Sequence, residues 1–272
     1  MFDLERWQEI FDTIRKNKLR TFLTGLSVAS GIFILVILLG FGQGMRNGIA
    51  NEFEQDASTS VWVWPGVTSK EFKGLNPGRR IQLRNEDYSN WTEQNTSRIE
   101  YNSARIFVRD VNITYGNEAL VYGVRGVHED FQFIENSRVS EGRFINYSDL
   151  VNTSKVIVIG NKIKKDVFGH LESPIGESVD ISGIPFKIVG VFKEQREREE
   201  ETLYIPLTTA QRVFNGGDRI SNMSYTLPMA ESFDQAVAEA VVFKEELKEY
   251  LGQVHTVHPE DDSALEVWSA LE

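Results

Sequence analysis

The chain has 272 residues, with 29 Lys and Arg against 40 Asp and Glu, a net charge of −11 and no cysteine. The missing cysteines exclude a disulfide framework, a thiolate zinc site and a cysteine nucleophile. The negative charge lies almost entirely after residue 44, which argues against nucleic acid as a partner.

The first twenty residues predict an amphipathic helix. Apolar side chains recur there at three- and four-residue spacing with charged residues between them: Phe2, Trp7, Ile10, Phe11 and Ile14. Such a helix can lie along the cytoplasmic face of a membrane, with Trp7 at the level of the lipid headgroups. It can also pack on a partner protein, and the spacing alone does not choose between the two.

Residues 21–45 form a stretch of 25 residues without a charge. As a helix this stretch exceeds the roughly 30 Å hydrocarbon core of a bilayer. A core helix of a soluble domain is rarely so long without polar residues, and a cleaved signal peptide would have a short basic start and a small-residue cleavage site. We therefore expect an uncleaved transmembrane helix.

Charges flank this predicted span asymmetrically. Before it lie Arg15, Lys16, Lys18 and Arg20, and after it come mainly acidic residues at 52, 54 and 56. The positive-inside rule then places the N-terminus in the cytoplasm and residues 46–272 outside the membrane.

Small residues within the span indicate that it has helical neighbours. Gly25 and Ala29 form one small-xxx-small pair, and Ser27 and Gly31 form another. Such pairs allow a second helix to approach closely, so we expect these four residues to contact further membrane helices. The four glycines from residue 40 to residue 48 are expected to make a flexible exit from the bilayer.

Short strands and helices alternate after the span, which predicts a mixed α+β fold. Strands are expected near residues 61–64, 104–109, 111–115, 119–124, 156–159, 178–181, 186–192, 202–205 and 254–257. Helices are expected over residues 85–94, from 161 to 169, from Ser232 to about Leu251, and again from Asp261 to the end of the sequence. The sequence ends inside that last predicted helix, as expected of a fragment. The charged segment 193–201 is interpreted as a solvated loop, with a partner-docking loop as the alternative.

Motifs for catalysis or cofactor binding are missing from the sequence. It contains no phosphate-binding G-x-x-x-x-G-K-[S/T] loop and no G-x-S-x-G nucleophile elbow. His255 and His258 are three residues apart, which on the predicted strand would point their rings to opposite faces and away from a shared metal ion. We therefore expect no catalytic residue, no cofactor and no metal site.

Three segments resemble the MacB-like permease subunits of bacterial ABC transporters. Residues 15–44 are similar to the opening helix of that family, with a basic N-K-L-R lead before the apolar span. Residues 124–193 resemble its periplasmic core in the order of short motifs, including V-R-G-V, E-G-R-F, V-I-V-I-G and I-V-G-V. Residues 203–214, L-Y-I-P-L-T-T-A-Q-R-V-F, match the element that follows.

The resemblance implies a domain plan. It assigns residues 1–20 to a cytoplasmic interfacial helix, 21–45 to the transmembrane helix and 46–272 to a periplasmic core domain. That core would combine a porter-like βαβ part, built from both flanks, with a strand-rich inserted subdomain over about 150–214. The family continues into three further membrane helices that this sequence lacks.

The resemblance also implies a function. The chain would be a non-enzymatic permease subunit in a bacterial inner membrane, relaying the ATP-driven motion of a separate ATPase subunit to the periplasmic domain. Expected partners are that ATPase, a second permease copy in a homodimer or heterodimer, and a periplasmic adaptor protein. The residues themselves leave two alternatives open: a single-pass sensor or binding protein with an outer ligand module, and an extracytoplasmic enzyme.

Overall fold

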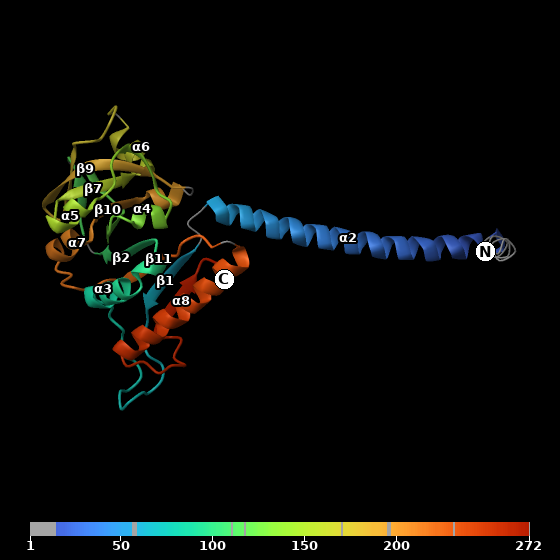
Figure 1. Cartoon of the computed structure of the whole chain (residues 1–272). Helices are drawn as coiled ribbons and strands as arrows, with labels where there is room; N and C mark the ends of the chain where they lie inside the picture. The colour runs from blue at the N-terminus through green and yellow to red at the C-terminus, as the bar shows by residue number, and fades with distance from the viewer. Residues whose placement is uncertain are drawn as a thin grey trace. The chain divides into compact units, whose positions relative to one another are not determined.

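The computed structural model describes residues 15–55, 59–109, 111–116, 118–169, 171–194, 197–230 and 232–271. The chain divides into two compact units, Met1–Gln55 and Asp56–Glu272 (Figure 1). Each unit is described by itself.

The first unit contains one long helix. Helix α2 covers Lys18–Gln55, which at about 1.5 Å per residue is long enough to cross a bilayer and continue beyond it. Within its segment Lys18–Met45, an 18-residue window has a mean hydropathy of 2.5, and none of that window is buried. The predicted span of 21–45 thus lies inside a continuous helix, whereas residues 1–14 of the predicted interfacial helix lie outside the described residues.

Helix α2 corrects the expected flexible exit. Gly40, Gly42, Gly44 and Gly48 are all helical, and the helix runs on to Gln55. Each glycine in a helix interior costs about 1 kcal/mol relative to alanine, but the continuous backbone hydrogen bonding of the neighbouring turns keeps all four in the helix.

The second unit is built on one mixed sheet in the described residues. Its strand order is β12-β1-β11-β2-β5-β10-β7-β9-β8-β3-β4, with β6 beside β9. Only the pairs β5–β10 and β7–β9 are parallel. The strands are β1 Ser60–Pro65, β2 Tyr101–Val108, β3 Ile113–Tyr115, β4 Glu118–Leu120, β5 Gly123–Val127, β6 Arg138–Gly142, β7 Val156–Gly160, β8 Ser178–Ile181, β9 Ile184–Lys193, β10 Thr202–Pro206, β11 Asn222–Thr226 and β12 Leu265–Ser269.

The helices of this unit are short, with one exception. They are α3 Asn85–Gln94, η1 Thr96–Arg98, α4 Phe131–Ile134, α5 Tyr147–Val151, α6 Asn161–Phe168, η2 Glu197–Glu200, α7 Leu207–Val213 and α8 Phe233–Val254. Helix α8, with 22 residues, lies beside β1 and β12 at one end of the sheet, next to α3 (Figure 1).

Two hydrophobic clusters divide the sheet into halves. In the first half, strands β12, β1, β11 and β2 place Val61, Val63 and Tyr225 on the face covered by α3 and α8. The Phe243 ring of α8 contacts the Tyr225 ring at 5.7 Å and the Trp91 ring of α3 at 5.5 Å. These aromatic contacts hold both helices on the sheet.

The second half surrounds β7, β9 and β10. The apolar run of β7, which the sequence marks as a buried strand, contributes Ile157 and Ile159 to this core, and Phe168 of α6 packs over it. Residues of the β3–β4 hairpin and of β5 join the same cluster. The boundary of 150–214 for an inserted subdomain stays a prediction.

Most predicted elements are confirmed, but the single strand predicted over 119–124 is divided between β4, which ends at Leu120, and β5, which begins at Gly123. The last segment is wrong in two places. Helix α8 continues to Val254 and ends in a turn, so residues 254–257 form no strand. The predicted terminal helix is instead strand β12, which pairs antiparallel with β1. Leu265, Val267 and Ser269 are buried and alternate with exposed residues, the two-residue period of a strand that has one face on the core.

Candidate functional site

The small residues of the predicted span lie on two sides of α2. Gly25, Ser27, Ala29 and Gly31 are all exposed, and a Cβ added at either glycine would meet no described atom within 4 Å. At about 100° per residue, Gly25 and Ala29 lie about 40° apart, whereas Ser27 lies about 200° from Gly25. The two small-xxx-small pairs therefore face nearly opposite directions, and one neighbouring helix cannot contact both.

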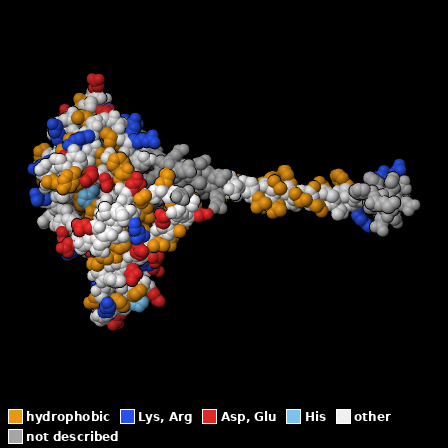
Figure 2. Space-filling view, in the orientation of Figure 1, with side chains coloured by type: hydrophobic (Ala, Val, Ile, Leu, Met, Phe, Trp, Pro, Cys, Tyr) orange, Lys and Arg blue, Asp and Glu red, His pale blue; other side chains and the backbone are white. Residues whose placement is uncertain are grey.

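The basic flank lies at and just before the start of α2. Arg15, Lys16, Lys18 and Arg20 are all exposed, and the first turn of the helix carries no acidic residue. Figure 2 shows Lys and Arg side chains at this end of α2 and apolar side chains along its middle. This arrangement is typical of a helix end in the headgroup layer of a membrane.

The strand that follows α2 is held on both edges. Four residues separate the end of α2 from β1, which pairs with β11 on one side and β12 on the other. At the start of β1, the Ala270 N–H donates to the Ser60 carbonyl oxygen at 3.0 Å and the Thr59 hydroxyl donates to the Leu227 carbonyl at 2.6 Å. A displacement of this end of β1 would thus be passed directly to both neighbouring strands.

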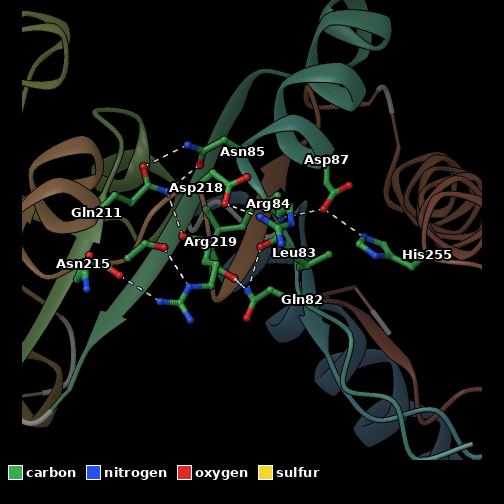
Figure 3. A network of polar contacts seen from close by, with 12 residues as sticks. Gln82, Leu83, Arg84, Asn85, Asp87, Gln211, Asn215, Asp218, Arg219 and His255 are labelled. Carbon is green, nitrogen blue, oxygen red and sulfur yellow. Dashed lines mark hydrogen bonds and ion pairs between the residues drawn. The ribbon is translucent and has the colours of Figure 1, made fainter.

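A polar network connects the N-terminus of α3 to the C-terminus of α8 (Figure 3). The buried Asp87 carboxylate accepts a hydrogen bond from the Arg84 backbone N–H at 2.8 Å. The same oxygen, Oδ2, lies 3.1 Å from Nε2 of His255. This buried carboxylate satisfies an otherwise unpaired N–H at the start of α3 and fixes the end of α8 against it.

The network continues from α3 to α7 and the loop after it (Figure 3). The side-chain amides of Asn85 and Gln211 exchange two hydrogen bonds, of 3.2 and 2.8 Å. Gln211 also donates to the Arg219 carbonyl at 3.0 Å. Arg84 forms an exposed ion pair with Asp218 at 2.6 Å, and that hydrogen bond lowers the pKa of the Asp218 carboxyl. These contacts join residues of the two halves of the sheet without involving a catalytic group.

A cluster of buried charge lies at the junction of the two halves. The Arg105 guanidinium lies within 5.5 Å of four aromatic ring centres, and its Nε donates to Asn222 at 3.0 Å. Burial lowers the pKa of Arg105 to about 10. Burial also raises the pKa of Glu194 to about 8, although Ser137 donates a hydrogen bond to its carboxylate. Segment 193–201 is therefore more than a solvated loop, since Glu194 and the buried Glu200 pack against the domain.

The two histidines near the end of the chain behave differently from the expectation. Because no strand forms there, the argument from opposite strand faces does not apply. His255 ends α8 and contacts Asp87, while the His258 ring packs edge-on against Phe72 at 5.4 Å. Within the described ranges, no group of three or more His, Cys, Asp or Glu could hold a metal ion.

Sequence reasoning missed both the polar network and the buried charge cluster. Their members come from positions as far apart as 84 and 255, or 105 and 222, so no local motif marks them. The one local signal is Asp87 at the third position of α3, where an acidic residue commonly accepts from the backbone before the helix.

Comparison with solved structures places this sheet in a known fold. The periplasmic region of MacB from Actinobacillus actinomycetemcomitans superposes with a TM-score of 0.62 at 21% identity, covering 80% of this chain and 92% of that one. The extracellular domain of the noncanonical ABC-type transporter YknZ from Gram-positive bacteria gives 0.60 at 21% identity, with 77% and 100% covered. The fold is therefore that of these extracytoplasmic domains.

Sequence relatives agree with the fold. A macrolide export ATP-binding/permease protein MacB of Hyphomonas neptunium is 25% identical over 240 residues, which cover 86% of this chain and 36% of the relative. The Haemophilus ducreyi protein of the same name is 26% identical over 210 residues, 75% of this chain and 29% of the relative. The chain thus spans about a third of the length of these curated relatives. The sequence model of the family described as MacB-like periplasmic core domain matches residues 21–241. With this match over most of its length, the chain belongs to the MacB-like periplasmic core domain family of ABC transporter permeases.

Proposed function

We propose that this chain is part of a permease subunit that passes motion of a separate ATPase to its extracytoplasmic domain. The observation that carries this proposal is the position of β1. Four residues separate it from the end of α2, and it lies between β11 and β12, so a movement that reaches the start of β1 would act on both neighbouring strands. The domain needs no catalytic group for such a role.

The proposal includes a topology and a domain plan. The N-terminus lies in the cytoplasm with residues 1–20 at the inner face of the membrane, residues 21–45 cross it, and residues 46–272 lie in the periplasm. The basic flank of α2 and its apolar middle support this orientation. Residues of about 150–214 form the inserted subdomain, and the porter-like part comes from both flanks.

Topology can be tested directly because the chain has no cysteine. A single cysteine at the exposed position Asn76 should react with a membrane-impermeant maleimide on intact spheroplasts, and one at Lys16 should react only after lysis. The reverse pattern would refute the orientation.

The proposed partners are an ABC ATPase subunit, a second permease copy and a periplasmic adaptor. The full-length protein should copurify from detergent-solubilised membranes with an ATPase subunit in stoichiometric amount. A full-length protein that is monomeric and carries no ATPase would instead support the single-pass sensor or binding protein.

Transmission itself is tested by uncoupling the helix from the sheet. Spin labels at Asn76→Cys and Val121→Cys, both exposed, report the distance between the two halves of the sheet. With the ATPase bound, ATP should shift this distance distribution. Ten Gly and Ser residues inserted after residue 57 should abolish the shift while leaving ATPase binding intact. The same insertion after Gly183, in the exposed turn between β8 and β9, is the control. An unchanged shift in the first variant would refute the mechanical role of β1.

A further inference from the structure

A cavity of about 230 Å³ opens where the end of β2 meets α7 and the loop that follows it. It adjoins the polar network, since Gln82 and Arg219 belong to both. Its apolar lining includes Ile106, Ala210 and Phe214, and its polar lining includes Arg109, Arg219 and Ser221. An open cavity with an apolar wall and a few converging polar groups is the usual form of a small-molecule site.

The charge of this cavity is opposite to that of the chain. Arg109 and Arg219 are its charged lining residues, and no carboxylate belongs to the described lining, in a chain of net charge −11. Arg109 forms no hydrogen bond or ion pair with any residue that the structure describes. An arginine with no carboxylate partner among the described residues, in the lining of a cavity, can pair with an anion.

The second arginine is held in place by the backbone. Its Nε donates to the Gly216 carbonyl at 3.0 Å and its Nη2 donates to the Asn215 carbonyl at 3.1 Å (Figure 3). These two bonds fix the plane of the Arg219 guanidinium and leave Nη1 for a further acceptor. Less side-chain freedom is then lost when a ligand binds.

A third donor comes from Ser221. Its Oγ accepts the Phe107 backbone N–H at 3.1 Å, so the hydroxyl hydrogen remains able to donate into the cavity. Phe214 stacks on Phe186 with ring centres 6.3 Å apart, which holds the Phe214 ring in place. The cavity thus combines fixed donors for an anion with an ordered apolar surface.

We propose that this cavity binds an organic carboxylate, whose oxygens pair with Arg109 and Arg219 and whose apolar part packs on Ile106 and Phe214. The apolar lining favours an organic acid over a free inorganic anion, because burying apolar surface adds to the charge pairing. Since Arg219 and Gln82 also belong to the network between α3 and α7, a bound acid would stiffen the connection between the two halves of the sheet. This inference does not depend on the proposed transport role.

The test uses the full chain in a nonionic detergent and benzoate as the probe, with binding followed by ligand-observed NMR. Benzoate should bind saturably, and Arg109→Gln should weaken it at least about tenfold, as expected for the loss of one charge-assisted pair. Arg109→Gln should keep the unfolding midpoint of the parent, because this side chain has no described partner. Arg138→Gln, which removes an exposed arginine outside the cavity, is the matched control and should leave binding unchanged.

Two further probes decide the ligand class. Benzylamine, of similar shape but positive charge, should not compete with benzoate. Inorganic phosphate should compete at least tenfold more weakly than benzoate. Any of four results would overturn the proposal. Benzoate does not bind, or it binds Arg109→Gln as well as the parent, or benzylamine competes with it, or phosphate binds as strongly as benzoate.

Discussion

The sharpest prediction concerns the pH dependence of stability and rests on His128. Nδ1 of this ring accepts a hydrogen bond from the Ala104 backbone N–H at 3.0 Å, and the ring stacks on Tyr88 with centres 4.9 Å apart. A second proton on the imidazole would have to occupy Nδ1 and would break that bond. Burial lowers the pKa of His128 to about 4.

The sign and size follow from linkage. The folded-state pKa lies below the ordinary value of 6.5, so the unfolded chain takes up the proton first as the pH falls. The contribution to stability is complete above about pH 6.5 and is lost progressively down to about pH 4. At about 1.4 kcal/mol for each pH unit, the loss amounts to at most about 3 kcal/mol, and less where solvent reaches the ring.

The perturbation is His128→Asn, whose Oδ1 can accept from Ala104 but does not titrate. Urea unfolding, followed by tryptophan fluorescence between pH 7.5 and 4, gives the free energy of unfolding of each protein. Wild type should lose more stability than the variant over that range, and the two should be parallel above pH 7. His258→Asn removes a histidine of the same domain away from this bond and serves as control. Parallel curves for wild type and His128→Asn throughout would refute the reasoning.

Three further predictions concern packing and charge. Gly25→Leu and Gly31→Leu should each lower the yield of assembled full-length complex on size-exclusion chromatography. Because the two glycines lie about 120° apart around α2, their effects should add, and a fully assembled double variant would argue against helix neighbours. Gly160→Ala should lower the free energy of unfolding in urea by several kcal/mol, because the added Cβ would lie 1.9 Å from a backbone oxygen of η2. Gly252→Ala in α8 is the control: open space surrounds this position, so the substitution should be neutral or stabilising. Glu194→Gln should stabilise the chain above pH 8 and leave its stability unchanged near pH 4.5. The folded-state pKa of Glu194 is raised to about 8, so the wild type loses stability as the pH rises through that value, whereas glutamine does not titrate. Equal free energies of unfolding for wild type and variant at pH 9 would contradict the burial of the Glu194 carboxyl.

The local sequence pattern was enough to predict the elements whose own residues determine whether they form a helix or a strand. The 25 uncharged residues before Arg46 predict a helix long enough to span a membrane, and α2 has that length and exposure. The apolar run of β7 and the predicted helix at residues 85–94 are likewise observed. In these segments the length of the apolar run or the spacing of apolar side chains involves only residues close together in the chain, so it can be read from the sequence.

Pairing with distant strands decided what the sequence left open. Leu265 and Trp268 carry apolar side chains compatible with either a helix or a strand, and the free edge of β1 selected the strand. In the same way, Arg109 and Arg219 meet at one cavity, and Asp87 meets His255, although more than one hundred residues separate each pair. Such contacts depend on sheet order and helix packing, which the sequence specifies through long-range burial and not through any local motif. The sequence by itself therefore determined a helix long enough to span a membrane and the mixed α+β class, while tertiary packing decided the last strand, the polar network and the cavity lined by Arg109 and Arg219.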